Sequence, residues 1–119
     1  MAQSARFQKL VADAKTRIRE ISPAEASQRQ QEGALLVDVR EAEEFAKGHA
    51  PGAVHLSRGT IELKIEEAAP DMATPVMCYC GGGGRSALVA DNLQRMGYTN
   101  VASVAGGFKA WKDQGLATS

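Results

Sequence analysis

Residues 74–86 read TPVMCYCGGGGRS, and this stretch decides the fold. The run from Thr74 to Tyr79 is predicted to be a short buried strand. Cys80 follows it and leads into four consecutive glycines, Gly81–Gly84. From Ser86 onward, apolar residues recur at helical spacing as far as Gly97. The stretch therefore predicts a buried strand, a tight glycine loop and a helix.

The rest of the chain repeats this alternation of short strands and helices. The sequence predicts strands at 34–39, 53–56 and 101–104, and helices at 22–32, 41–47, 60–69 and around 108–111. Ser22-Pro23-Ala24-Glu25 has the pattern of a capping box with proline at the first helical position. We therefore expect a single α/β domain with a mainly parallel central sheet, flanked by helices on both faces.

The N-terminal segment predicts a helix outside this alternation. Six apolar residues recur at steps of three and four, as in an amphipathic helix: Phe7, Leu10, Val11, Ala14, Ile18 and Ile21. We interpret residues 1–20 as an N-terminal helical extension and residues 21–119 as the domain proper. Packing of this helix onto the domain is favoured over a role at a membrane surface or in partner binding.

Composition and charge exclude several classes of function. The 119 residues suffice for one domain, and 14 Lys plus Arg balance 14 Asp plus Glu, so the formal charge is 14 − 14 = 0. Without a basic excess we expect no nucleic acid partner. We also expect no membrane span and no secretory signal. The only cysteines, Cys78 and Cys80, are too few for a disulfide framework, which favours a reducing, cytoplasmic location.

The chemistry is expected in the loop after Cys80. In open α/β sheets, ligands bind beyond the carboxyl ends of the strands, where loops lead into helices. Glycines let a loop curl tightly and direct successive N–H groups inward, and a helix N-terminus adds partial positive charge. The loop from Gly81 to Arg85 should thus favour negative charge on the Cys80 sulfur, and Ser86 could cap the following helix. An accessible, reactive Cys80 is favoured over a buried apolar one, and a built loop over a flexible linker.

Four motifs in order make the sequence resemble the rhodanese-homology family. They are Leu36-Val37-Asp38-Val39-Arg40 with Glu44-Phe45, Gly48-His49-Ala50-Pro51-Gly52-Ala53-Val54, Cys80 through Ser86, and Gly106-Gly107-Phe108 with Trp111. The matches cover roughly Ile21 to Gly115.

The resemblance implies a rhodanese-like fold and a sulfurtransferase that moves sulfane sulfur through a persulfide on Cys80. The donor would be a small molecule such as thiosulfate or a persulfide, and the acceptor a thiol or cyanide, with a sulfur-relay protein as a further possible partner. Gly81, Gly82, Gly83, Gly84, Arg85 and Ser86 would bind the substrate, and Arg85 would favour an anionic donor. Asp38 and Arg40 match a signature near the active site, either as electrostatic support or as a structural ion pair. No cofactor is implied beyond the covalent persulfide.

Two other functions stay open. Cysteine-dependent phosphatases and arsenate reductases on a related scaffold separate cysteine from arginine by five residues, whereas four lie between Cys80 and Arg85. The shorter loop should suit a single sulfur atom better than a phosphoryl group. A non-catalytic protein-binding module would be expected to lack Cys80. We expect no metal site, because neither His49 nor His55 has a zinc-ligand spacing to the cysteines, and we expect Cys78 to be buried in the core.

Overall fold

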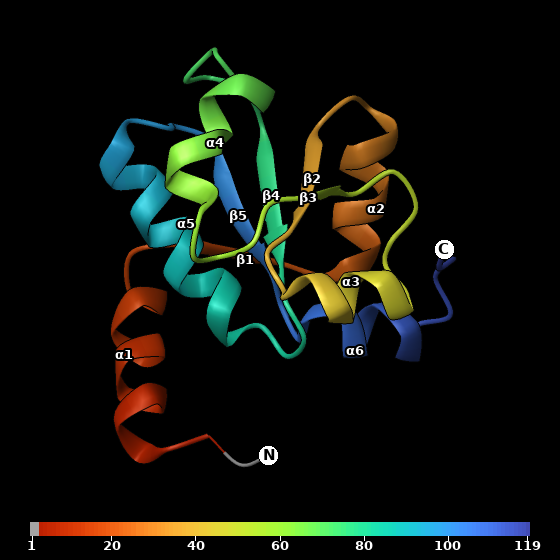
Figure 1. Cartoon of the computed structure of the whole chain (residues 1–119), viewed down its shortest axis with the longest axis horizontal. Helices are drawn as coiled ribbons and strands as arrows, with labels where there is room; N and C mark the ends of the chain where they lie inside the picture. The colour runs from red at the N-terminus through yellow and green to blue at the C-terminus, as the bar shows by residue number, and fades with distance from the viewer. Residues whose placement is uncertain (1–2) are drawn as a thin grey trace.

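The strand before the glycine loop lies at the centre of a parallel sheet. In the computed structural model, which describes residues 3–119, this strand is β4 (Val76–Tyr79). The other strands are β1 (Arg19–Ile21), β2 (Leu35–Asp38), β3 (Val54–His55) and β5 (Val101–Val104). Their order in the sheet is β1-β5-β4-β2-β3, and every pairing is parallel (Figure 1). The carboxyl ends of all five strands therefore meet at one edge, where Cys80 follows β4.

Helices cover both faces of the sheet, as the sequence predicts. The helices are α1 (Ala5–Lys15), α2 (Pro23–Gln31), α3 (Ala42–Lys47), α4 (Ile61–Ala68), α5 (Gly84–Met96) and α6 (Gly107–Asp113). One core cluster joins α4 and α5 to the sheet through residues such as Ile65 and Val89. The other joins α2 and α6 to the opposite face (Figure 1). There Phe108 and Trp111 pack near Tyr79. Both faces of the central strand β4 are buried, which explains why none of its four residues is charged.

The N-terminal helix is shorter than the sequence predicts. It ends at Lys15, and Arg19–Ile21 forms the edge strand β1, in which Ile21 pairs with Val104 of β5. The prediction that the helix continues through Ile18 and Ile21 was therefore wrong. Pairing with the open edge of β5 supplies backbone hydrogen bonds and buries Ile21, and this tertiary gain overrides the helical spacing. The division at residue 20 into extension and domain stays a prediction.

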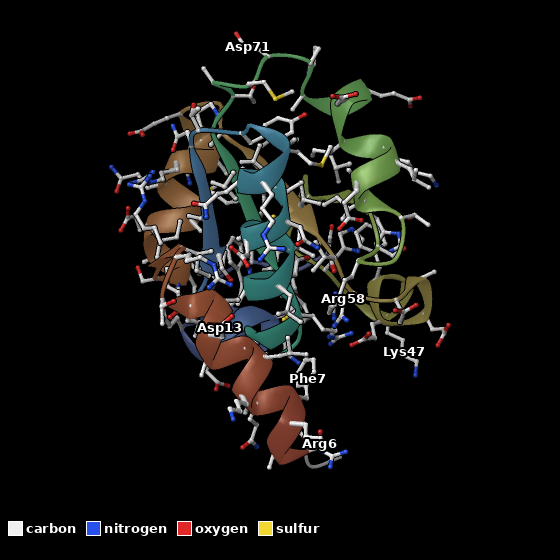
Figure 2. The ribbon with its side chains drawn as sticks, turned by 90° about the vertical axis from the view of Figure 1, so that its left-hand side faces the viewer. Arg6, Phe7, Asp13, Lys47, Arg58 and Asp71 are labelled. Atoms are coloured by element: carbon white, nitrogen blue, oxygen red, sulfur yellow. The ribbon has the colours of Figure 1, made fainter. Side chains whose placement is uncertain are left out.

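Helix α1 packs against α5, so the expected docking onto the domain is confirmed. Val11 and Ala14 are buried, and Arg17 donates to both carboxylate oxygens of Asp91 at 3.0 and 2.8 Å. Figure 2 shows α1 beside the lower part of α5, with Phe7 and Arg58 close to each other. No helix within residues 3–119 is long and apolar enough to cross a membrane.

Candidate active site

The Cys80 sulfur receives two hydrogen bonds from the loop that follows it. The Gly83 amide donates to Sγ at 3.1 Å, and the Ser86 hydroxyl lies 3.5 Å from the same atom. Gly83 has φ +103°, a conformation in which glycine is favoured, and this turn directs its N–H toward the sulfur. Both contacts favour an anionic sulfur, and the N-terminus of the 13-residue helix α5 adds partial positive charge.

The loop is tighter than the sequence predicts. Helix α5 begins at Gly84, with Gly83 as its N-cap, so Ser86 lies inside the first turn and does not cap the helix. Within the described residues, Gly83 is the loop residue whose amide donates to Sγ. The side chain of Ser86 is fully buried and reaches the sulfur and the Gly83 carbonyl instead.

Ser103 belongs to the same polar cluster and was not predicted. Its hydroxyl lies 2.8 Å from the Ser86 hydroxyl, and both serines are fully buried. Ser103 sits on β5, next to the strand that ends at Cys80. A lone polar residue within Val101–Val104 is the signal that could have identified it. Because a buried hydroxyl needs a partner, the Ser103 contact restricts how the Ser86 hydroxyl turns.

The first turn of α6 holds the loop from behind. The amides of Phe108 and Lys109 donate to the carbonyls of Cys80 and Gly81 at 2.7 and 3.1 Å. A Cβ on Gly107, which has φ +58°, would lie only 2.4 Å from the Cys80 carbonyl oxygen. The motif Gly106-Gly107-Phe108 is thus explained by the close approach of two backbones.

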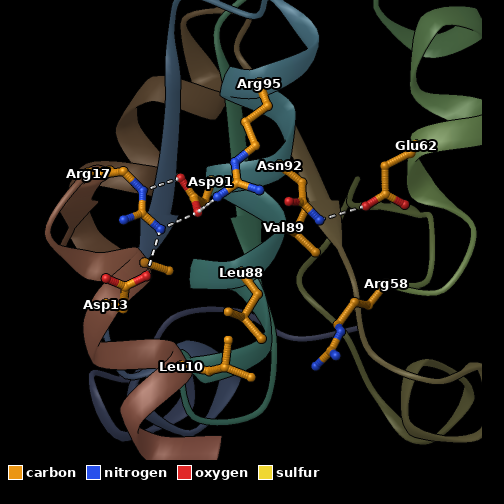
Figure 3. Close-up of a pocket in the computed structure, with 11 residues that line it drawn as sticks. Leu10, Asp13, Arg17, Arg58, Glu62, Leu88, Val89, Asp91, Asn92 and Arg95 are labelled. Carbon is orange, nitrogen blue, oxygen red and sulfur yellow. Dashed lines mark hydrogen bonds and ion pairs between the residues drawn. The ribbon is translucent and has the colours of Figure 1, made fainter.

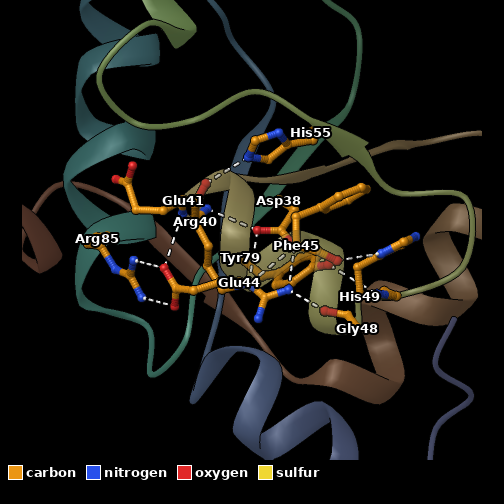
Figure 4. A network of polar contacts seen from close by, with 11 residues as sticks. Asp38, Arg40, Glu41, Glu44, Phe45, Gly48, His49, His55, Tyr79 and Arg85 are labelled. Carbon is orange, nitrogen blue, oxygen red and sulfur yellow. Dashed lines mark hydrogen bonds and ion pairs between the residues drawn. The ribbon is translucent and has the colours of Figure 1, made fainter.

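Asp38 and Arg40 form a buried ion pair beside this support. Arg40 Nη2 lies 2.7 Å from Asp38 Oδ2 and donates also to the Gly48 carbonyl at 2.7 Å (Figure 4). The side chains are 0% and 7% exposed, and the guanidinium lies 4.4 Å from the centre of the Phe108 ring. The pair therefore contacts the residue that anchors α6 to the loop, and none of its hydrogen bonds among the described residues reaches Cys80.

Arg85 is engaged by a carboxylate that the sequence did not single out for this role. Its Nη1 and Nη2 donate to Oε1 and Oε2 of Glu44 at 2.7 and 3.1 Å (Figure 4). Glu44 Oε1 also accepts from the Glu41 amide, in a capping box that starts α3. Hydrogen bonding to Arg85 lowers the pKa of Glu44 to about 2 and raises the pKa of Arg85. Arg85 is therefore part of a two-pronged ion pair at the rim of the loop.

Cys80 is only 1% exposed, so the expectation of an accessible cysteine was wrong. Side chains from two helices approach the loop. A Cβ on Gly84 would lie 3.3 Å from Phe7 and 3.4 Å from Val11 of α1, and one on Gly81 would lie 3.9 Å from Glu44 Oε2 of α3. The position of Cys80 at a strand end is visible in the sequence, but the packing of α1 and α3 around its loop is not.

The second cysteine and a groove between α1 and α5 lie apart from this chemistry. Cys78 is fully buried, as predicted, and burial raises the pKa of its thiol to about 12. A groove of about 280 Å³ runs between α1 and α5, where Leu10, Leu88 and Arg58 line it (Figure 3). Its polar side chains include the Arg17–Asp91 ion pair, which explains the contact between the two helices. Cys80 does not line it.

Comparison with known proteins places the fold in a family. A family model described as rhodanese-like domain matches residues 22–114. The thiosulfate sulfurtransferase GlpE of Pseudomonas entomophila (strain L48) is 40% identical over 92 residues, which are 77% of this chain and 83% of the relative.

Two solved structures match nearly the whole chain. A protein of unknown function from Rhodopseudomonas palustris CGA009, described as a possible tyrosine phosphatase, is 31% identical with a TM-score of 0.84, covering 100% of this chain and 99% of that one. The polysulfide-sulfur transferase homodimer of Wolinella succinogenes is 29% identical with a TM-score of 0.83, covering 97% and 88%. The parallel sheet with a cysteine loop after its central strand, the matched family model and the 40% identical relative agree, and the chain belongs to the rhodanese-like domain family.

Proposed function

We propose that this protein is a sulfurtransferase that carries sulfane sulfur as a persulfide on Cys80. The observation that carries the proposal is the pair of donors, the Gly83 amide and the Ser86 hydroxyl, that converge on the Cys80 sulfur. They favour a thiolate before transfer and an anionic terminal sulfur after it. The relative named as a thiosulfate sulfurtransferase and the solved polysulfide-sulfur transferase support the reaction class.

The reaction proceeds in two displacements. The Cys80 thiolate attacks the outer sulfur of thiosulfate, a new S–S bond forms, and the electron pair of the broken S–S bond leaves with sulfite. The resulting Cys80–S–S⁻ then gives its terminal sulfur to cyanide or to a thiolate acceptor, and the Cys80 thiolate returns. An organic persulfide R–S–SH serves in the same way and leaves as R–S⁻. The covalent persulfide is the only cofactor that this route needs, and the acceptor can be a small molecule or a sulfur-relay protein.

The covered position of Cys80 adds a conformational step. With 1% exposure, the sulfur meets a donor only after side chains at the rim of the loop move. The rim consists of side chains from α1 and the Glu44–Arg85 pair, whereas the back of the loop is held by backbone hydrogen bonds. Side-chain rearrangement is fast compared with catalytic turnover, so the cover is compatible with transfer.

A phosphatase is the second candidate, favoured by the description of the Rhodopseudomonas palustris structure as a possible tyrosine phosphatase. Phosphoryl transfer needs cationic and amide donors around three phosphoryl oxygens. Here Arg85 is bound in two-pronged fashion to Glu44, and Gly83 supplies the amide contact to Sγ. This arrangement suits one sulfur atom better than a phosphoryl group.

The test is a mass measurement on the intact protein. After incubation with thiosulfate or an organic persulfide, the wild type should gain one sulfur atom, and addition of cyanide should remove it with formation of thiocyanate. Cys80→Ser should gain none, while Cys78→Ala, which removes the other thiol, should gain sulfur like the wild type. No gain in the wild type, or the same gain in Cys80→Ser, overturns the proposal. Hydrolysis of para-nitrophenyl phosphate that Cys80→Ser abolishes would support the phosphatase instead.

A further inference from the structure

Arg85, in the first turn of α5 beside the loop, is already paired with Glu44 before any donor binds. Both oxygens of Glu44 accept hydrogen bonds from it, at 2.7 and 3.1 Å. Glu44 is held in place from its own side, because the Glu41 amide at the start of α3 donates to Oε1 at 3.1 Å. Hydrogen bonding to Arg85 lowers the pKa of Glu44 to about 2, so Glu44 is ionised at neutral pH. The rim therefore presents a neutral pair and not a free arginine.

The pair lies next to the part of the loop that a donor must approach. A Cβ on Gly81 would lie 3.0 Å from Arg85 Nη2 and 3.9 Å from Glu44 Oε2, so both charges border the residue after Cys80. The other arginine close by, Arg40, is buried in its pair with Asp38. The chain as a whole has no net charge that could attract an anion. An anionic donor thus meets a carboxylate beside Gly81, and the charge of the neighbouring Arg85 is already matched.

We infer that Glu44 is the residue that sets donor preference: by holding Arg85, it disfavours thiosulfate and directs the site toward organic persulfides. The inference rests on the proposed sulfur transfer. Thiosulfate brings two negative charges and releases sulfite, so its transition state places a dianionic leaving group near Glu44. In the reaction Cys80–S⁻ + R–S–SH → Cys80–S–SH + R–S⁻, the leaving group carries a single charge. Fewer charges near a carboxylate cost less free energy.

The test compares two donors that differ by one charge, and it relies on how their ratio changes on substitution, because their leaving groups also differ in basicity. Methanethiosulfonate, CH₃–SO₂–S⁻, has a methyl group where thiosulfate has an O⁻, and each transfers its outer sulfur to Cys80 as the S–S bond breaks. In the wild type, kcat/KM for loading should be higher with methanethiosulfonate. Glu44→Gln removes the charge and releases Arg85, so the ratio of thiosulfate to methanethiosulfonate loading should rise by about tenfold.

Glu43→Gln is the matched control. Glu43 precedes Glu44 on α3, is exposed and makes no ion pair among the described residues, so the same change of charge there should leave the ratio within about twofold of the wild type. An equal rise in both variants would show an effect of total charge and overturn the inference. So would a folded Glu44→Gln that loads sulfur with the wild-type ratio. If the wild type loads from neither donor nor from an organic persulfide, the proposed function itself is overturned.

A measurement on the wild type alone covers the case in which Glu44→Gln does not fold. Sodium chloride screens charges, and because Glu44 matches the charge of Arg85, added salt should leave loading from the dianion relative to loading from methanethiosulfonate unchanged or raise it. A free Arg85 would attract the dianion, and added salt would then lower the same ratio. A decrease therefore overturns the role of Glu44 without any substitution.

Discussion

The Cys80 loop is held differently on its two sides. On the α6 side, backbone amides of α6 donate to the loop carbonyls, and the Asp38–Arg40 pair is 0% and 7% exposed. On the α1–α3 side, the contacts are made by side chains, and the Glu44–Arg85 pair is 37% and 29% exposed. Both sides have one carboxylate–arginine pair, yet their surroundings differ in burial and in the groups they hold.

Because of this difference, the α6 side positions the Cys80 sulfur, whereas the α1–α3 side controls the access of a donor to it. Backbone hydrogen bonds and a desolvated ion pair have few alternative arrangements, so the α6 side fixes where the sulfur lies. Half-exposed side chains exchange partners with water at little cost, so the α1–α3 side can open for a donor. Substitutions on the α6 side should therefore lower stability, and those on the α1–α3 side should mainly change reactivity.

The largest loss of stability is expected from Asp38→Asn. It leaves the Arg40 guanidinium buried without its counter-charge, next to Phe108. Breaking a buried ion pair from one side costs about 4 kcal/mol. Unfolding in urea, followed by circular dichroism, measures the loss.

Glu25→Gln supplies the comparison for an exposed pair. Glu25 and Arg29 form an (i, i+4) pair at 2.6 Å on α2, with side chains 46% and 31% exposed. Its loss should cost less than about 0.5 kcal/mol. If Asp38→Asn costs as little as Glu25→Gln, the α6 side is not the rigid side.

The next largest effect is expected from Gly107→Ala. Its Cβ would lie 2.4 Å from the Cys80 carbonyl oxygen and 2.7 Å from that of Gly81, and φ is +58°. Overlap with two backbone atoms and the unfavourable φ should together cost about 3 kcal/mol. Thermal or urea unfolding gives the value, and sulfur loading should fall because the loop shifts.

Gly115→Ala separates the two causes. Gly115 has a similar φ of +75°, but a Cβ there meets no atom within 4 Å. Its replacement should lower the free energy of unfolding by about 1 kcal/mol, which is the effect of the positive φ alone. Equal costs at the two glycines would mean that close approach of α6 to the loop is unimportant.

The α6 side of the loop is also the side whose features the sequence predicts best. A strand leading into Cys80, the following glycines, and Gly106-Gly107-Phe108 are local patterns, and each corresponds to a local backbone requirement. Asp38 and Arg40 lie two residues apart and are joined in a pair, as one of the two interpretations predicts. Such features are predictable because the neighbours along the chain determine them.

The features that the sequence did not predict depend on contacts between distant segments. Glu44 meets Arg85 across 41 residues, and Ser103 meets Ser86 across 17. Ile18 and Ile21 follow helical spacing, yet Ile21 enters a strand because β5 has an open edge. Nor does local sequence reveal that α1 packs beside Gly84 at the end of the loop. Each of these four features depends on tertiary packing and not on the local sequence.

A smaller effect on stability is expected from Phe7→Ala, on the α1–α3 side of the loop. Phe7 packs near Gly84, and its loss removes part of the cover over the loop. Stability should fall by about 1 kcal/mol, because Phe7 is only partly buried. Alkylation of Cys80 by iodoacetamide should become about fivefold faster, as opening of the cover costs less.

Leu10→Ala tests whether this effect is specific. Leu10 lies on the same helix and is 58% exposed, so its replacement should leave the alkylation rate of Cys80 close to the wild-type value. Peptide mapping assigns the modified cysteine. Should both variants react equally fast, the cover would depend on the presence of α1 as a whole and not on Phe7.

The smallest effect concerns acid. The pKa of Glu44 falls from 4.5 to about 2 in the folded protein, first because Arg85 donates hydrogen bonds to it. Between these values the unfolded chain binds the proton more readily than the folded one, so the Glu44 contribution to stability is full above pH 4.5 and is lost as the pH falls through about 2. Water screens this partly exposed pair, so the contribution stays below about 1 kcal/mol.

Because other carboxylates titrate in the same pH range, the quantity to measure is the difference in unfolding free energy between the wild type and Glu44→Gln. That difference should be greatest near neutral pH and disappear toward pH 2; a difference that does not change with pH would mean that the pair is not held by charge.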